Sequence, residues 1–200
     1  MNAVKSIVGS RYFLWAILAL PSIPMVIGLL NGNADPHRLL HPTGEFSARF
    51  MIIAMIATPL RMLFQGQSWT AWLVRNRRYF GVAAFAYAAL HTVLYVIDMN
   101  SLQAMLDQFF ELGIWTGWVA FFIFIPLAIT SNDASVRALR EKWKPLQRMV
   151  YVAAVLTLLH WIFIENHLGP ALVHFVPLAL LEAYRIWQNQ TRKAKAASTS

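Results

Sequence analysis

The chain has 200 residues, of which 58% are hydrophobic and only 13% are charged. Soluble domains carry about a quarter charged residues, so this composition excludes an ordinary soluble protein and indicates an integral membrane protein. The absence of cysteine excludes disulfides, iron–sulfur clusters, a haem thiolate and covalent c-type haem attachment. The formal charge of +8 is typical of a membrane protein whose basic residues face one side, so we expect no nucleic-acid partner.

Six apolar stretches follow one another along the chain, and each is long enough to cross a bilayer. A helix of roughly 17–25 residues spans a hydrocarbon core about 30 Å thick. The sequence therefore predicts an all-α integral membrane protein, a six-transmembrane helix bundle that forms one domain over residues 1–200. The predicted spans are residues 12–30, 47–64, 79–99, 113–131, 147–167 and 170–187, followed by a basic tail at 188–200.

The first stretch has features of a signal peptide, because Lys5 and Arg11 precede its apolar core. Pro21 and Pro24 are followed, however, by a further apolar run to Leu30. Proline removes a backbone donor and bends a helix. We therefore expect a membrane helix that is kept and is kinked at the prolines.

The basic residues sort to one side of the predicted membrane. With both termini cytoplasmic, 15 of the 17 Lys and Arg residues lie on the cytoplasmic side, and only Arg38 and Arg49 lie outside. Six of the nine acidic residues lie outside. Because cytoplasmic loops are enriched in Lys and Arg, this distribution predicts cytoplasmic termini and a multi-pass protein of the membrane.

Two histidines lie deep inside predicted spans, at matching depth. His91 follows Tyr79 by 12 residues and His160 follows Gln147 by 13, roughly 18 Å and 20 Å along a helix. An ionisable side chain at that depth marks a functional site by default. Two imidazoles that face each other across a bundle are what a six-coordinate haem iron needs as axial ligands. Small residues on the same faces would let a flat macrocycle approach: Ala84, Ala88 and Ala153.

The same two histidines could instead be structural residues that hydrogen-bond across helices. The matched depth of His91 and His160 favours a cofactor, and a zinc site would need further ligands that neither span supplies. His167, His174 and Arg49 lie near the outer boundary, where each could contact the haem or its propionates, or could simply be interfacial. We expect His37 and His41 to be solvated in an outer loop.

Arg77 and Arg78 lie at the inner face beside Trp69 and Trp72. These two arginines could bind a flavin phosphate or a quinone headgroup. They could also be positive-inside charge next to an aromatic belt.

Several short patterns occur in a characteristic order along the chain. They are Arg77-Arg78-Tyr79-Phe80-Gly81, Leu90-His91, Thr116-Gly117, Pro126-Leu127-Ala128-Ile129-Thr130-Ser131, Val150-Tyr151 and Leu159-His160. In these patterns the chain resembles the MsrQ (YedZ) family, haem-binding membrane subunits of the periplasmic methionine sulfoxide reductase system. That family belongs to the wider ferric-reductase-like group, together with the membrane domain of NADPH oxidases.

The resemblance implies a b-type haem (haem b) and FMN in a bacterial inner membrane. It implies electron flow from the quinone pool, or from an inner-face flavin served by a cytosolic flavin reductase, to a periplasmic molybdenum-dependent partner. His91 and His160 match the family's histidines in the third and fifth spans. Family members tend to carry another histidine where this chain has Gln147, so we expect one haem fewer here.

On this interpretation the chain is an electron-transfer subunit rather than the catalytic subunit of an oxidoreductase. One alternative is a stand-alone haem-containing reductase of ferric iron or quinone. An alternative of another class is a small proton-coupled transporter that uses its histidines to carry protons, which would show no haem spectrum.

Overall fold

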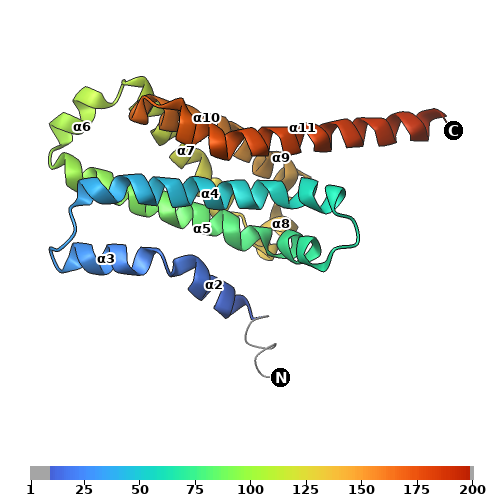
Figure 1. The fold of residues 1–200 in the computed structure, drawn as a ribbon, viewed down its shortest axis with the longest axis horizontal. Helices are drawn as coiled ribbons and strands as arrows, with labels where there is room; N and C mark the ends of the chain where they lie inside the picture. Colours follow the sequence, from blue (N-terminus) through green and yellow to red (C-terminus); the bar gives the residue numbers. More distant parts are fainter. Residues whose placement is uncertain (1–9, 199–200) are drawn as a thin grey trace.

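The computed structural model describes residues 10–198, and every regular element in that range is helical (Figure 1). The all-α prediction is confirmed for this part of the chain. The elements are α2 (Arg11–Ala19), α3 (Ser22–Leu30), α4 (Pro36–Leu63), α5 (Ser68–Met99), α6 (Leu102–Gln108), α7 (Leu112–Ile129), α8 (Asp133–Leu139), the 3₁₀ turn η1 (Arg140–Lys142), α9 (Trp143–Arg148), α10 (Val150–Glu165) and α11 (Leu168–Ser198).

The first predicted span is two short helices rather than one. The axes of α2 and α3 meet at 51°. Pro21 lies at the break, immediately before the first residue of α3, and it has no N–H to continue the hydrogen-bond ladder of α2. The expected proline kink is therefore confirmed.

Helix α4 begins 11 residues before the predicted span. Asp35 caps it, because its side chain accepts a hydrogen bond from the backbone N–H of His37, and Pro36 occupies the first turn. His37 and His41 therefore lie on a helix, and the expectation of an outer loop is wrong for them. Their side chains are 75% and 59% exposed, so the expectation of solvation holds.

Among the described residues, four helices are long and apolar enough to cross a membrane. The count is five if α2 and α3 together form one broken span. Helix α11, which contains the sixth predicted span, is not among them. The chain is thus a multi-pass membrane protein, and the six-span count remains a prediction.

The helices pack as an elongated bundle built around α4 and α5. These two run side by side along its length, α2 and α3 flank them on one side, and α7, α10 and α11 lie on the other (Figure 1). Small buried residues such as Ala48, Ala84 and Ala153 let the helices approach closely. A second cluster that includes Leu14 and Phe80 joins the broken first span to the bundle.

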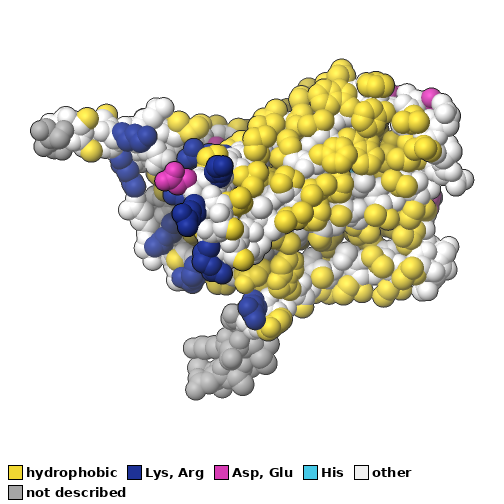
Figure 2. Space-filling view, turned by 180° about the vertical axis from the view of Figure 1, so that it is seen from behind, with side chains coloured by type: hydrophobic (Ala, Val, Ile, Leu, Met, Phe, Trp, Pro, Cys, Tyr) yellow, Lys and Arg dark blue, Asp and Glu magenta, His cyan; other side chains and the backbone are white. Residues whose placement is uncertain are grey.

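The surface of the bundle is divided by side-chain type. Yellow apolar side chains cover its length in Figure 2, and dark blue Lys and Arg gather at the end beyond which α11 extends. Large apolar residues on the outer faces of three helices are about half exposed or more, including Phe122, Val155 and Leu180. Such an apolar belt with charge at one end suits contact with lipid.

Candidate functional site

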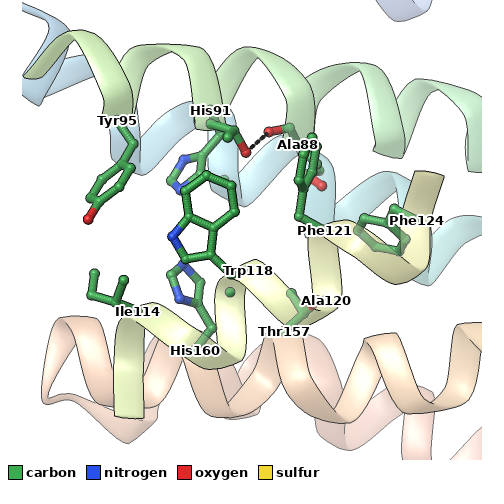
Figure 3. A pocket seen from close by; sticks show the side chains of 14 residues that line it. Ala88, His91, Tyr95, Ile114, Trp118, Ala120, Phe121, Phe124, Thr157 and His160 are labelled. Atoms are coloured by element: carbon green, nitrogen blue, oxygen red, sulfur yellow. Dashed lines mark hydrogen bonds between the residues drawn. The ribbon is translucent and has the colours of Figure 1, made fainter. Parts of the chain in front are cut away.

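The imidazoles of His91 and His160 point toward each other across the bundle (Figure 3). His91 comes from α5 and His160 from α10, and their ring centroids are 6.0 Å apart with planes at 87°. A metal–imidazole bond is about 2 Å long, so a metal held between two Nε2 atoms separates them by about 4 Å. The distance from each Nε2 to the centroid of its own ring accounts for the rest of the 6.0 Å between the centroids. The spacing therefore suits one metal ion between the rings.

Each of these histidines is held through its other ring nitrogen. His91 Nδ1 donates to the carbonyl oxygen of Leu40 at 2.9 Å, and His160 Nδ1 donates to that of Gly113 at 2.6 Å. A carbonyl can only accept, so Nδ1 carries the proton and Nε2 keeps its lone pair. Neither Nε2 has a hydrogen-bond partner among residues 10–198. Both histidines are therefore oriented as metal ligands are.

A Thr-Gly dipeptide lies against each histidine. Thr43 Oγ1 is 3.0 Å from the Leu40 oxygen that His91 uses, and Thr116 Oγ1 is 3.0 Å from the Gly113 oxygen that His160 uses. Both threonines are buried. Each threonine hydroxyl lies closer still to the carbonyl four residues back, at 2.7 Å for Leu39 and 2.6 Å for Leu112, and its single proton is shared between the two carbonyls.

The glycine of each dipeptide leaves room for the imidazole. A Cβ on Gly117 would lie 2.6 Å from His160 Nδ1, and a Cβ on Gly44 would lie 3.2 Å from His91 Nδ1. In a helix the side chain at position i+4 lies near the carbonyl of residue i. Glycine there opens the carbonyls of Gly113 and Leu40 to a side chain from another helix.

Cavities surround the two imidazoles. One of about 90 Å³ lies among aromatic side chains, including Trp118 and Phe121, and Ala88 lines it as expected. Another of about 270 Å³ extends toward the outer end. Ala84 and Ala153 line neither of these two cavities and are packed in the apolar core.

Two polar atoms beside these cavities have no partner within residues 10–198: the buried Tyr95 Oη and the buried Trp161 Nε1. Buried donors are rarely left unpaired, so these two are available to a bound group. The unpaired Nε2 atoms and the space that Gly44 and Gly117 leave for the imidazoles point the same way. The site therefore fits a haem with two axial imidazoles.

Charged side chains line the outer cavity and its rim. His41 Nδ1 is 2.6 Å from Glu165, and Glu45 pairs with Arg49. Arg49 Nε in turn donates to His174 Nε2 at 3.2 Å. The structure therefore brings Arg49 and His174 together near the site, although neither lines the cavity.

His167 lies in the turn between α10 and α11 and is exposed. It lines neither cavity beside the histidine pair. Of the three sequence-predicted neighbours of the haem, His167 is the one that the structure does not bring to the site.

A third cavity, of about 340 Å³, lies at the basic end of the bundle, and we call it the inner cavity. Arg77 and Arg78 line it, as does Gln147. The Gln147 amide donates to the Leu127 carbonyl and to Thr130 Oγ1, at 3.1 and 2.9 Å. Phe124 lines both this cavity and the aromatic cavity beside His160.

The model of the family described as "Ferric reductase like transmembrane component" matches residues 43–158, a range that contains both Thr-Gly dipeptides and His91 and ends two residues before His160. The chain is 33% identical over 175 residues to a protein of Xanthomonas campestris pv. campestris, covering 84% of this chain and 78% of that protein. It belongs to the MsrQ family.

Further MsrQ relatives match over most of their length. One from Rhizobium meliloti is 34% identical over 86% of this chain and 82% of its own, and one from Herminiimonas arsenicoxydans is 31% identical over 98% and 93%. All three relatives are named "Protein-methionine-sulfoxide reductase heme-binding subunit MsrQ". No solved structure matches the chain.

Proposed function

We propose that this chain is a b-haem electron-transfer subunit that passes electrons from the quinone pool, or from an inner-face flavin, to a periplasmic methionine sulfoxide reductase partner. The observation that carries this proposal is the facing pair His91 and His160. Their Nε2 atoms have no hydrogen-bond partner among residues 10–198, while both Nδ1 atoms are hydrogen-bonded. The names of the relatives as haem-binding subunits support it.

In this proposal His91 and His160 would hold haem b. Donation from each Nδ1 to a carbonyl fixes the tautomer and the ring orientation and makes Nε2 more basic. A haem bound there would supply one-electron chemistry. The aromatic wall at Trp118 and Phe121 would exclude water from the site.

The surroundings divide into an outer and an inner side. Arg49 and His174 form a bonded pair next to the outer cavity, where Arg49 would offset the negative charge of haem propionates. Arg77 and Arg78 line the inner cavity, where a flavin (FMN, by resemblance) or a quinone would deliver electrons. The chain would be one domain in a bacterial inner membrane, with cytoplasmic termini and a molybdenum-dependent partner in the periplasm.

Replacement of the ligands tests the proposal. His91→Ala and His160→Ala should each abolish the low-spin six-coordinate spectrum of the purified protein, because each removes one axial ligand. His167→Ala is the matched control, since His167 is exposed and lines neither cavity beside the pair; its spectrum should be unchanged. A normal low-spin spectrum in both ligand variants would contradict the assignment.

The electron acceptor separates the proposal from a stand-alone reductase. Reduced protein should reoxidise over repeated turnovers when the periplasmic catalytic subunit and methionine sulfoxide are added together, and methionine sulfoxide without that subunit should not reoxidise it. Equally fast reoxidation by ferric chelates without the partner would favour the stand-alone reductase. A purified protein that binds no haem would favour the proton-coupled transporter.

A further inference from the structure

We infer that Tyr95 of α5 and Trp161 of α10 donate hydrogen bonds to the propionate groups of the haem, and so fix which edge of the macrocycle faces outward. This inference rests on the proposed function, because it concerns the orientation of a haem held between His91 and His160. It assigns the direct contacts to two uncharged side chains rather than to Arg49.

The two donors are buried and unused. Tyr95 Oη and Trp161 Nε1 are closed to solvent and have no hydrogen-bond partner among residues 10–198. Both residues line the outer cavity, on the same side of the histidine pair. A buried donor without a partner is costly, so native proteins keep few of them. Two such donors beside one cavity indicate that an acceptor occupies it.

Ring contacts hold both donors in place. The ring of Tyr95 meets that of Trp118 nearly at right angles, with centroids 6.3 Å apart. The ring of Trp161 lies 5.2 Å from that of His174 and 6.4 Å from that of Phe175. Donors that are already fixed lose little side-chain freedom when an acceptor binds.

The other side of the histidine pair is poorly suited to a carboxylate. Phe121 and Phe124 lie there, across the imidazole pair from Tyr95 (Figure 3). The hydroxyls that line the aromatic cavity already donate to backbone carbonyls; they belong to Ser47, Thr92 and Thr157. A hydroxyl has one proton to give, and burial of an ionised group without donors is costly. The apolar, vinyl-bearing edge of a haem suits this side instead.

The outer cavity can accept a carboxylate although two acids line it. Glu165 is paired with His41 at 2.6 Å, and Glu45 is paired with Arg49. The negative charge of both acids is therefore already compensated. Arg49 also donates to His174, so it would offset propionate charge from nearby while the two uncharged donors make the contacts.

This orientation matters for the direction of electron transfer. With the propionates outward, the apolar edge of the macrocycle faces Phe124, which also lines the inner cavity. Tyr95 and Trp161 would thus set which edge faces the donor side and which edge faces the acceptor side.

Haem and haem dimethyl ester test the inference on the full-length protein. The ester keeps the iron and the macrocycle but lacks the two negative charges. Protein made in haem-deficient cells would be loaded with either group, and transfer to excess apomyoglobin would give the rate of loss. Tyr95→Phe and Trp161→Phe should each speed the loss of haem about tenfold. They should speed the loss of the ester by less than about threefold, because hydrogen bonds to an ionised acceptor are the stronger ones.

Tyr87→Phe and Trp118→Phe are the matched comparisons. Tyr87 is buried, donates to the Leu18 carbonyl and lines neither cavity beside the histidine pair, whereas Trp118 lines only the aromatic cavity of the two. Both variants should affect haem and ester alike. Equal acceleration of both losses by Tyr95→Phe and Trp161→Phe, or none, would overturn the inference. A haem-selective effect of Trp118→Phe would put the propionates on the aromatic side and would overturn it too.

The optical spectrum of each sample separates this inference from the proposed function. His91 and His160 are intact in all four variants, so each loaded protein should keep its low-spin spectrum. A wild-type protein that takes up neither haem nor its ester would contradict the proposed function and the inference with it. A low-spin wild-type protein whose variants show no haem-selective loss would overturn the inference alone.

Discussion

At the scale of single residues, the candidate haem site depends on a backbone feature that occurs twice. A carbonyl, a threonine three residues later and a glycine four residues later form one seat for each imidazole. The two seats lie on α4 and α7, and the histidines come from α5 and α10. The orientation of each imidazole is therefore set by a hydrogen bond to a neighbouring helix as well as by the rotamer of its own side chain.

Gly117→Ala tests the seat of His160. The new Cβ would lie 2.6 Å from Nδ1, so the imidazole must move and its bond to Gly113 must break. Alanine is otherwise favoured over glycine in a helix by about 1 kcal/mol, so the substitution should not destabilise α7 itself. Haem occupancy after purification should fall by an order of magnitude or more.

Gly44→Ala should have a smaller effect, because its Cβ would lie 3.2 Å from His91 Nδ1. Gly169→Ala is the neutral control, since a Cβ there meets nothing within 4 Å. Full haem occupancy in Gly117→Ala would show that the seat does not position His160.

The crossed imidazole planes predict a spectroscopic signature. Rings held at 87° would interact with two different orbitals of a bound iron, whereas parallel rings would interact with the same one. The oxidised protein should therefore give a strongly anisotropic low-spin signal in low-temperature electron paramagnetic resonance. A three-line rhombic signal would mean that the rings turn toward parallel when haem binds.

The sequence predicts the histidine pair but not its seats. His91 and His160 stand out because a polar side chain deep in an apolar stretch is costly wherever the helices pack. Thr43 and Gly44 carry no such signal, since both are common near helix ends. Their role depends on which carbonyl faces which imidazole, and that is decided only by tertiary packing.

At the scale of helices, hydropathy locates the spans but not the ends of the helices. Helix α5 begins at Ser68, 11 residues before the predicted span, and α11 continues through the predicted basic tail to Ser198. Apolar residues report the part of a helix that lies in lipid. Where the helix begins and ends outside the lipid depends on capping residues such as Asp35, and a hydropathy pattern does not reveal these residues.

The residues at the inner ends of α5 and of the α9–α10 segment include no second histidine pair, so we expect one haem per chain. Arg78 and Gln147 each lie 13 residues before one of the two histidines, and both line the inner cavity. A guanidinium has no lone pair to offer, and the Gln147 amide is already engaged. Pyridine haemochrome assay against quantitative amino-acid analysis should give a ratio near one; a ratio near two would reveal a second ligand pair.

At the scale of the whole molecule, the distribution of charge predicts the orientation in the membrane. Lys and Arg gather at the end where α4 passes into α5 and beyond which α11 extends (Figures 1 and 2). Reporter fusions after Gly66, Asn132 and Ser200 should therefore read as cytoplasmic, and fusions after Asn33 and Gln103 as periplasmic. A periplasmic signal from the Ser200 fusion would show that a span is missing or miscounted.

A bound iron would act as a cross-link, because it would join His91 of α5 to His160 of α10. Iron between His91 and His160 would close a loop of about 70 residues, which by the chain-entropy estimate for disulfides stabilises a fold by about 4 kcal/mol. Through the Leu40 and Gly113 carbonyls the same cross-link would reach α4 and α7, so four helices would share it. Chains without haem should then be more readily degraded in cells, and a ligand variant would lose abundance together with colour.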